Sequence, residues 1–466
     1  MAFDLVIRGP DVVTPGHREI TDIGIDGGRI AQIGGTMTGA EEIAAGGLLA
    51  IPAGIDAHTH LVHRGLASRF ESKVWVDDFW SGSRAAIAGG ITTIGNMTFP
   101  APQPDGTAES PRAAISREMA GAAAEAAVDW FLHPVVYEPA ALPDGAIGGL
   151  AEAGHASIKI FLSDPGLSAD GPALLSAATA AKTAGAVLLL HCEDGAMLEA
   201  AGHELIASGR GAIANFADAR PVAAEAAAVE TAIGIARRTG AAVYIVHLSS
   251  AAALDRCRRA RAAGLPVYVE TRPLYLHLTK DRFAEPDGAK YTGAPPLREA
   301  SDREALWAGL AAGDVDTVCS DHAPWTLADK LDPALDVMTA RQGVADLETL
   351  MPMLYSEGVA AGRISLARFV ELTSANAARI FGLYPRKGII AAGADADIAL
   401  WDPRHKRTVD GARMQSLAGY SVYDGWTVQG WPRLVLRRGE VVLADGEITA
   451  RPGDGRWLQR TGTPLA

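Results

Sequence analysis

The central part of the chain alternates apolar, β-rich runs with alanine-rich stretches of helical character. The apolar runs do not alternate strictly with polar residues, as is typical of parallel strands that are buried on both faces. Two of the helical stretches between them are residues 172–183 and 222–238. Eight β units that alternate with helices predict an α/β fold, namely a (β/α)8 TIM barrel. The eight runs are residues 47–55, 91–97, 130–136, 157–162, 186–190, 242–246, 266–270 and 316–319.

The two ends of the chain show a different pattern, with short strand-like segments that are broken by turns. These segments are residues 3–8, 23–25 and 29–33 at one end, and 396–401, 433–438 and 440–444 at the other. Gly27-Gly28 between two of them is a hairpin signal. Neither end makes a full sheet alone. We therefore predict a small β-sandwich domain from residues 1–50 plus 388–450, a barrel over 51–387 and a C-terminal tail over 451–466.

Composition and charge narrow the class of partner. The chain has 466 residues, which is enough for one large domain plus a small one. Its formal net charge of −13 argues against a nucleic-acid or anionic-membrane partner, because such surfaces attract basic patches. Cys192, Cys257 and Cys319 are widely spaced and do not predict a disulfide framework. The sequence begins without a signal-peptide pattern and has no apolar run near the roughly 20 residues of a membrane helix, so we expect a cytoplasmic protein.

Polar residues with metal-binding chemistry lie in the apolar runs or directly after them. His58 and His60 are two residues apart, so on a strand their side chains point to the same face. His191, His247 and Asp321 each end a later run. In a barrel the strand ends converge on one mouth, where catalytic residues collect. Four imidazoles and a carboxylate at that mouth predict a site for Zn²⁺ or a similar divalent ion.

Lys159 lies inside the fourth run, in the segment Ser-Ile-Lys-Ile-Phe-Leu. An ordinary ammonium at that place would repel divalent cations, and burying it without a partner is costly. Two interpretations remain open. Either Lys159 pairs with a buried carboxylate, or its amine has reacted with CO₂ to give an anionic carbamate whose two oxygens bridge two metal ions.

Five motifs carry these residues: Gly-Ile-Asp-Ala-His-Thr-His-Leu, Ile-Lys-Ile-Phe-Leu, Leu-His-Cys-Glu-Asp-Gly, Ile-Val-His-Leu-Ser-Ser and Ser-Asp-His-Ala-Pro. Together they resemble the motifs of the cyclic amidohydrolases, most closely the hydantoinase/dihydropyrimidinase branch, and the resemblance covers nearly the whole chain. It implies that His58, His60 and Asp321 hold one metal ion. His191 and His247 would hold the other ion, and the carboxylated lysine of the second motif would bridge the two. The ions would be zinc, with manganese or cobalt as alternatives.

The resemblance also implies a mechanism and a partner. A metal-bound hydroxide attacks an amide carbonyl of a small cyclic amide or ureide, of the hydantoin or dihydropyrimidine type. Asp321 accepts the proton of the hydroxide and passes it to the leaving nitrogen. The ring then opens to a carbamoyl or amide acid. The family resemblance further implies a homo-oligomer, either a dimer or a tetramer.

Three positions expected near the substrate depart from the hydantoinase pattern. Asp164 stands where hydantoinases usually have a Tyr. Either the substrate presents a donor there, or this loop has moved, or Asp164 is a turn residue before Pro165. Arg272 lies in a segment that reads Cys-Pro-Gln-Tyr in hydantoinases. It binds an anionic substituent, or it pairs with Glu270 or a surface carboxylate. Gln342 takes the place of an Asn and can make the same amide contacts from a longer arm.

Two loops are expected to complete the substrate site. The segment 291–298, which includes Ala294, resembles the substrate-binding loop of the hydantoinases. The loop after the first run carries Leu66, Phe70 and Trp75, which are candidates for an apolar wall around the substituent of the ring. Packing of these side chains within the loop itself is the alternative interpretation.

Other functions remain open at this point. Allantoinase activity is one of them, since allantoinases also lack the Tyr. Dihydroorotase activity ranks lower, because its Arg and Asn for the substrate carboxylate correspond to Val62 and roughly Phe99 here. A structural relative that has lost its metals is disfavoured because all six ligand positions are filled. A hydrolase of a lactone or of an acyclic amide is the remaining alternative.

Overall fold

The structure is a computed structural model, and it describes residues 2–62, 75–102, 109–168 and 170–460. Within these residues eight parallel strands form the barrel, and each pairs with its neighbour along the chain. A bridge between Val135 and Lys159 joins the third strand to the fourth, and a bridge between Thr59 and His322 closes the ring. The predicted (β/α)8 barrel is thus confirmed. Its strands are β8 (Gly54–Thr59), β9 (Ile91–Thr98), β10 (Asp129–Pro134), β11 (Ser157–Phe161), β12 (Val187–His191), β13 (Val243–Ile245), β14 (Val267–Thr271) and β15 (Thr317–Val318).

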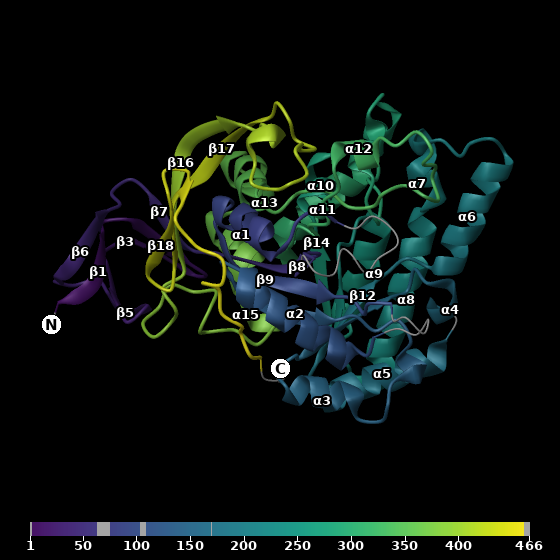
Figure 1. Cartoon of the computed structure of the whole chain (residues 1–466), viewed down its shortest axis with the longest axis horizontal. Helices are drawn as coiled ribbons and strands as arrows, with labels where there is room; N and C mark the ends of the chain where they lie inside the picture. Colours follow the sequence, from purple (N-terminus) through teal and green to yellow (C-terminus); the bar gives the residue numbers. More distant parts are fainter. Residues whose placement is uncertain (1, 63–74, 103–108, 169, 461–466) are drawn as a thin grey trace.

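Helices surround these strands on the outside, as Figure 1 shows on its right side. The predicted helical stretches are α5 (Gly171–Thr183) and α8 (Val222–Thr239), which pack against each other. Their alanines allow a close approach and leave few voids. The other helices along the barrel are α1 (Phe79–Ala88), α2 (Pro111–Glu125), α3 (Ala146–Glu152), α4 (Pro165–Ser168), α6 (Gly195–Ala207), α7 (Phe216–Ala219), α9 (Ala251–Ala262), α10 (Pro273–His277), α11 (Ala300–Ala312), α12 (Leu327–Lys330), α13 (Leu350–Leu354), α14 (Leu366–Val370) and α15 (Asn376–Ile380). Among the described residues, no helix is both long and apolar enough to span a membrane.

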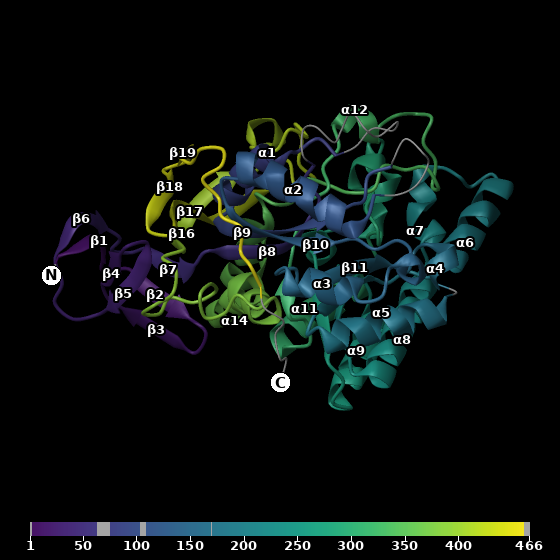
Figure 2. The same cartoon turned by 60° about the horizontal axis from the view of Figure 1, so that its bottom comes forward.

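Both ends of the chain contribute to two further sheets at one side of the molecule, drawn in purple and yellow in Figure 2. One sheet has the order β5-β4-β1-β6 and the other the order β19-β18-β17-β16-β7-β2-β3. Side chains from both sheets, among them Ile25 and Ile398, share one apolar core, as in a β-sandwich. The strands are β1 (Phe3–Arg8), β2 (Asp11–Thr14), β3 (His17–Ile20), β4 (Ile23–Asp26), β5 (Arg29–Ile33), β6 (Gly39–Ala44), β7 (Leu49–Pro52), β16 (Ile398–Thr408), β17 (Thr427–Arg437), β18 (Glu440–Ala444) and β19 (Glu447–Ile448).

The first apolar run, residues 47–55, was predicted to be the first strand of the barrel, and this prediction is wrong. The run spans β7, which belongs to the seven-stranded sheet, and only the beginning of β8. Both strands are fully buried, so the apolar pattern continues across the break between them. His58 accordingly lies inside the barrel strand β8 and not after it. The exact domain boundaries stay a prediction.

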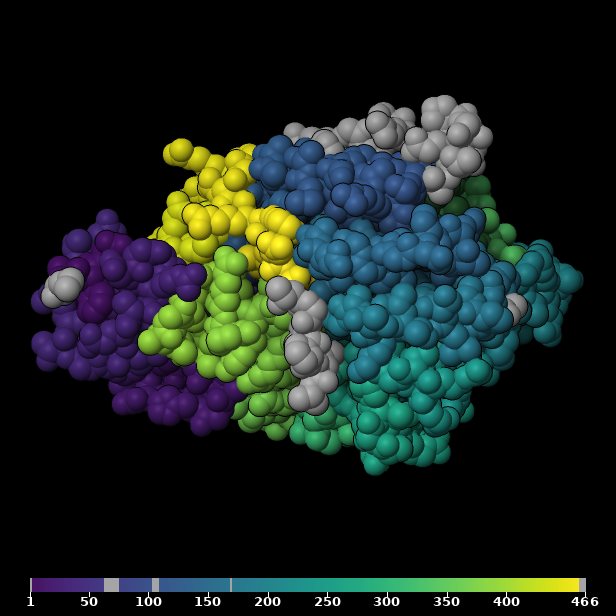
Figure 3. Space-filling view, turned by 90° about the horizontal axis from the view of Figure 1, so that it is seen from below, coloured from purple at the N-terminus to yellow at the C-terminus, as the bar shows by residue number. Residues whose placement is uncertain are grey.

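The C-terminal segment lies across the N-terminal end of the barrel. The backbone amide of Leu458 donates to the Trp130 carbonyl, and the amide of Arg460 donates to the Gly154 carbonyl. Figure 3 shows these last residues in yellow against the blue residues of the barrel. The guanidinium of Arg460 is fully buried and donates to the Leu132 carbonyl and the Ser157 hydroxyl. The tail therefore covers the barrel at the end opposite to the mouth.

Candidate metal centre and pocket

A cavity of about 520 Å³ lies at the C-terminal ends of the barrel strands. Its described wall includes five of the six predicted metal ligands, and the sixth, His58, is fully buried beside them. The parallel strands converge there, which brings residues from β8, β11 and β12 and from the segments after β13 and β15 into one place. The five ligands on the wall are His60, Lys159, His191, His247 and Asp321.

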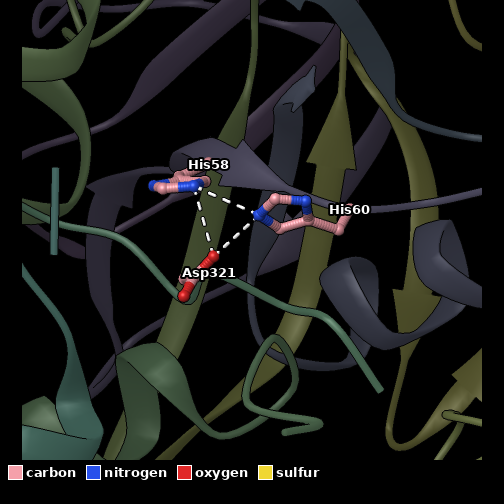
Figure 4. A group of neighbouring side chains, drawn as sticks. All are labelled: His58, His60 and Asp321. Carbon is pink, nitrogen blue, oxygen red and sulfur yellow. Dashed lines mark hydrogen bonds and ion pairs between the residues drawn. The ribbon is translucent and has the colours of Figure 1, made fainter. Parts of the chain in front are cut away.

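His58, His60 and Asp321 form a tight buried cluster, drawn in Figure 4. The Nε2 atoms of the two imidazoles are 3.3 Å apart. Asp321 Oδ1 lies 2.8 Å from His60 Nε2 and 3.2 Å from His58 Nε2. Three ligand-type atoms thus face one another. Two of them come from the first barrel strand and the residue after it, and the third comes from the segment after the last barrel strand. Two facing imidazole nitrogens and a carboxylate are the donor set that a divalent metal ion prefers.

Lys159, His191 and His247 lie next to this cluster. The ring centroids of His58 and His247 are 5.4 Å apart, and those of His191 and His247 are 4.6 Å apart. Lys159 Nζ is buried and has no hydrogen-bond partner among the described residues. Burial lowers the pKa of Lys159 to about 8, although the charges of Asp321 and Glu270 oppose this shift. Within the described ranges, no carboxylate pairs directly with Lys159, a pairing that was one of the two interpretations.

These residues fit a metal centre by the test of unsatisfied atoms. His247 Nδ1 and Lys159 Nζ are buried without a partner in the described part of the chain, and both residues line the cavity. Burial lowers the pKa of His60 to about 4 and also lowers the pKa of His247. Both imidazoles are therefore neutral at pH 7, which is the form that binds metals. Buried polar atoms are normally hydrogen-bonded, so a group of unpaired ones points to an external ligand.

Two buried glutamates orient the histidines, and sequence reasoning did not assign them this role. Glu270 Oε1 lies 2.7 Å from His58 Nδ1 and accepts from the His247 backbone amide at 2.8 Å. Glu193 Oε2 lies 2.8 Å from His191 Nε2, and its Oε1 accepts from Arg220 Nε at 3.1 Å. Carboxylates of this kind fix the ring orientation of metal-binding histidines. The available signal was a charged residue at the end of an apolar run, which needs a buried partner.

Among the residues that the structure describes, Arg272 pairs neither with Glu270 nor with a surface carboxylate, contrary to one expectation. Its Nη1 donates to Asp321 Oδ2 at 2.8 Å, and its side chain is fully buried. Nor does it stand on the described wall of the cavity, where an anionic substituent would bind. Although burial favours the neutral carboxyl, Arg272 and His58 keep the pKa of Asp321 well below its usual value. The sequence could not identify Asp321 as the partner, because strands β14 and β15 bring the two together.

Asp164, Gln342, Ala294 and Trp75, four of the expected substrate contacts, all line the cavity, and their contact with a substrate stays a prediction. Asp164 Oδ1 also accepts from the Leu167 backbone amide at 3.0 Å, which is the turn role that was its alternative. The aromatic side of the cavity consists of Trp75 with Phe99, Tyr137 and Phe161. The predicted contacts Leu66 and Phe70 lie outside the described residues.

Lys330 connects two segments of the cavity wall, a role that sequence reasoning did not assign to it. Its Nζ is buried and donates to the carbonyls of Thr292, Arg341 and Gly343, at 2.6, 2.6 and 2.9 Å. These acceptors flank Ala294 and Gln342, which are on the wall. A single ammonium thus holds the two loops together. A lone lysine in a polar stretch of sequence does not reveal such a role.

The chain matches the model of the amidohydrolase family over residues 49–442. It is 35% identical to the D-hydantoinase of Rhizobium radiobacter over 463 residues, which cover 98% of this chain and 99% of the relative. A solved D-hydantoinase from Bacillus sp. AR9 superimposes with a TM-score of 0.93 at 36% identity, covering 99% of this chain and 100% of the other. The dihydropyrimidinase of Brevibacillus agri superimposes with a TM-score of 0.92 at 34% identity, covering 99% of both. This chain therefore belongs to the amidohydrolase family, and its similarity to hydantoinases and dihydropyrimidinases extends over its full length.

Proposed function

We propose that the protein is a metal-dependent hydrolase that opens the ring of a cyclic amide or ureide of the hydantoin or dihydropyrimidine type. One observation carries this proposal: six ligand-type side chains converge at one cavity. The chain around them is 35% identical over nearly its full length to a D-hydantoinase. The names of the relatives supply the substrate class, and the geometry supplies the reaction class.

Two divalent ions would be held by this chain's own residues. His58, His60 and Asp321 would bind one ion, and His191 with His247 would bind the other. The ions would be zinc, or manganese or cobalt. When bound, such ions polarise a carbonyl and lower the pKa of a water molecule toward neutrality.

Lys159 would join the two halves of the centre as a carbamate. Its Nζ is buried and lacks a partner among the described residues. Lys159 lines the cavity from β11, which lies between β8, the strand of His58, and β12, the strand of His191. The lowered pKa of Lys159 makes its neutral amine accessible, and this amine would add CO₂ and release a proton to give a carbamate anion. The carbamate would satisfy the buried position and supply oxygen ligands for the two ions, whereas the ammonium would repel both.

Asp321 would move the proton of the reaction. Its Oδ1 faces His58 and His60, while Arg272 holds Oδ2. At Oδ1 the carboxylate would accept the proton of the attacking water and pass it to the leaving ring nitrogen. The C–N bond of the ring breaks, the oxygen of water ends on the carbonyl carbon, and the proton ends on the nitrogen. The product is a carbamoyl or amide acid.

The cavity suits a neutral ring with an apolar substituent. Its volume of about 520 Å³ lies within the range that is usual for small-molecule sites. Trp75, Phe99 and Phe161 supply aromatic surface on one side. Arg220 is the arginine on the described wall, and it is engaged by buried Glu193. A substrate carboxylate would therefore lack a free cation there, which disfavours dihydroorotase activity.

A substrate panel tests the proposal. Purified protein, loaded in turn with Zn²⁺, Mn²⁺ and Co²⁺, is offered hydantoin, both enantiomers of 5-phenylhydantoin, dihydrouracil, allantoin, cyclic imides, dihydroorotate and acyclic amides. We expect ring opening of a hydantoin or dihydropyrimidine, and Asp321→Asn serves as the inactive control. Turnover of acyclic amides without activity on any cyclic amide would refute ring opening.

Metal analysis is an independent check. Protein purified without chelator should hold close to two equivalents of divalent metal per chain. Less than one equivalent would remove the metal-dependent mechanism. The homo-oligomeric assembly and the cytoplasmic location stay predictions.

A further inference from the structure

Arg272 is a buried arginine that is not one of the six candidate metal ligands. It follows β14, and its backbone is extended at the position that precedes α10. Its side chain is fully buried, and the hydrogen bond to Asp321 Oδ2 is the one that the structure gives it within the described residues. Its Nε and Nη2 atoms have no partner there. A buried charge with so few bonds is stabilised chiefly by the carboxylate that it faces.

The contact divides the two oxygens of Asp321 between two tasks. Oδ2 accepts from Arg272 at 2.8 Å, whereas Oδ1 lies 2.8 Å from His60 Nε2 and 3.2 Å from His58 Nε2. A carboxylate that is free to rotate about its Cβ–Cγ bond would exchange these oxygens or tilt its plane. The charged hydrogen bond on one oxygen opposes both motions, because such bonds are short and directional.

The guanidinium itself is held in place by close packing. Its Cζ lies 5.7 Å from the ring centroid of Tyr275. On another side is Gly293, where an added Cβ would come within 3.3 Å of Arg272 Nη1. Gly293 precedes Ala294 of the cavity wall, so the loop of the substrate site also limits the movement of Arg272. Tyr275 of α10 and the loop at Gly293 therefore both limit the movement of the Arg272 guanidinium.

The backbone of Asp321 needs such support. Its φ of 50° lies in the left-handed region, which a residue other than glycine adopts at a cost in free energy. A strained conformation of this kind persists where the surroundings determine it more than once. The carboxylate of Asp56 accepts from the Ser320 amide at 3.2 Å and fixes the preceding backbone. Arg272 fixes the side chain that follows.

From these contacts we propose that Arg272 is a positioning residue for Asp321. It holds Oδ2, so that Oδ1 alone is presented to His58, His60 and the cavity. This inference rests on the proposed function, since it assigns Arg272 a part in the same reaction. It explains why an arginine can stand at this buried place without touching the substrate.

The test uses Arg272→Ala, with and without low-millimolar methylguanidine to refill the space. Two readouts are taken from the full-length holoenzyme. The first is kcat and KM for the best substrate of the panel. The second is the visible absorption of protein loaded with Co²⁺, which reports the arrangement of ligands around the metal and does not depend on turnover. Arg460→Ala is the matched control, because it removes an equally buried guanidinium at the opposite end of the barrel.

We expect Arg272→Ala to retain its metal, to lose kcat by about 100-fold with KM changed much less, and to show an altered Co²⁺ spectrum. Methylguanidine should restore part of kcat and return the spectrum toward that of the unaltered protein. Arg460→Ala should change neither readout at the site. If Arg272→Ala does not fold, Arg272→Lys carries the test, and its shorter point charge should give an intermediate kcat and spectrum.

Three outcomes would overturn the inference. They are an unchanged kcat and spectrum, a loss of activity that follows loss of metal, and a loss that methylguanidine restores equally in Arg460→Ala. The two proposals fail in different ways. If the unaltered protein opens no ring on the panel, the proposed function fails, whereas the Co²⁺ spectra still decide the position of Asp321.

Discussion

Two buried lysines at opposite ends of the barrel have opposite surroundings. Lys159, at the mouth, has no hydrogen-bond partner within the described residues, and burial lowers its pKa to about 8. Lys387, at the N-terminal end of β10, donates to Asp129 and Asp397 at 2.6 Å each and lies 3.1 Å from Asp395. Burial opposes its charge too, but the three carboxylates raise its pKa above the ordinary value.

The difference separates structural charges from functional ones. Both lysines are almost inaccessible to solvent, so burial alone does not distinguish them. The ammonium of Lys387 is compensated by the protein itself, and it links the barrel to the strand that returns into the β-sandwich. The amine of Lys159 has no such compensation among the described residues, and it lines the cavity. Because perturbed buried groups gather at functional sites, these two features together support the role proposed for Lys159.

Removing Lys159 should give the largest effect on activity. Lys159→Met and Lys159→Ala should each lower kcat/KM by about a thousandfold or more, because the bridging group and metal are lost together. Metal analysis should show fewer than two equivalents per chain. Short carboxylic acids should partly rescue Lys159→Ala by replacing the carbamate. Activity that survives without rescue would show that the bridging role is wrong.

A second change at the mouth separates chemistry from folding. Asp321→Asn should keep the fold, measured by circular dichroism and thermal unfolding, while kcat falls by about 10² to 10⁴. The amide cannot accept and return the proton as a carboxylate does. Near-normal turnover would remove Asp321 from proton transfer. Near-normal turnover would also change the comparison between the two ends of the barrel, because a buried charged residue at the mouth would then have a structural role.

Lys387→Met should affect stability where the substitutions at the mouth affect rate. We expect the free energy of unfolding at pH 7 to fall by about 3 to 5 kcal/mol, since three carboxylates lose their buried counterion. In denaturant titrations of metal-free protein, Lys159→Met should cost much less, because its ammonium has no hydrogen-bond partner among the described residues. Lys280→Met, which removes the surface pair with Glu299, should cost less than about 1 kcal/mol. Equal losses of unfolding free energy in Lys159→Met and Lys387→Met would contradict the proposed difference between the two lysines.

The pH dependence of this difference has a definite sign. The pKa of Lys387 is raised above 10.5, so its contribution is complete below pH 10.5 and is lost only as the pH rises through the folded value. Burial works against the charge of Asp129, but Lys387 and Arg438 lower its pKa below 3.8, so its contribution is complete above pH 3.8 and is lost as the pH falls. The stability gap between the unaltered protein and Lys387→Met should therefore be widest between these limits.

Lys330 is a third kind of buried lysine. Its substitution should have the smallest effect of those considered. Its partners are neutral carbonyls of the two wall loops. Lys330→Met should raise KM about tenfold, which corresponds to roughly 1.4 kcal/mol of binding free energy, while kcat changes less. Steady-state kinetics on the best panel substrate would measure both. A fall in kcat with KM unchanged would contradict the role in holding the loops.

The sequence was sufficient for the barrel because its strands are buried on both faces and read as continuous apolar runs. The same property caused the error at residues 47–55. There β7 and β8 are both buried, so no polar residue marks the passage from one sheet to another. Hydrophobicity reports burial, and it does not report which sheet a strand joins.

The convergence of the six candidate ligands was predictable because each stands in or after a strand, and strand ends meet at one mouth. Their partners were not. Glu270 reaches His58, and Arg272 reaches Asp321, through space between strands that are far apart in the sequence. Pairings of this kind depend on strand order and side-chain reach, which a single sequence does not contain. Lys330 escaped notice for the same reason, since its partners are backbone carbonyls.

The position of β7 has a consequence for how the chain is made. β7 pairs on one edge with β2, which is already synthesised, and on the other edge with β16, which follows the entire barrel. While the ribosome synthesises the barrel, one edge of the apolar strand β7 lacks its partner β16. An unpaired strand edge can pair with other chains and promote aggregation. A barrel that folds during synthesis would do so while the sheet beside it is incomplete, and the pairing of β16 with β7 then completes that sheet. Slow translation between β7 and β16 should favour aggregation more than the same delay after β16.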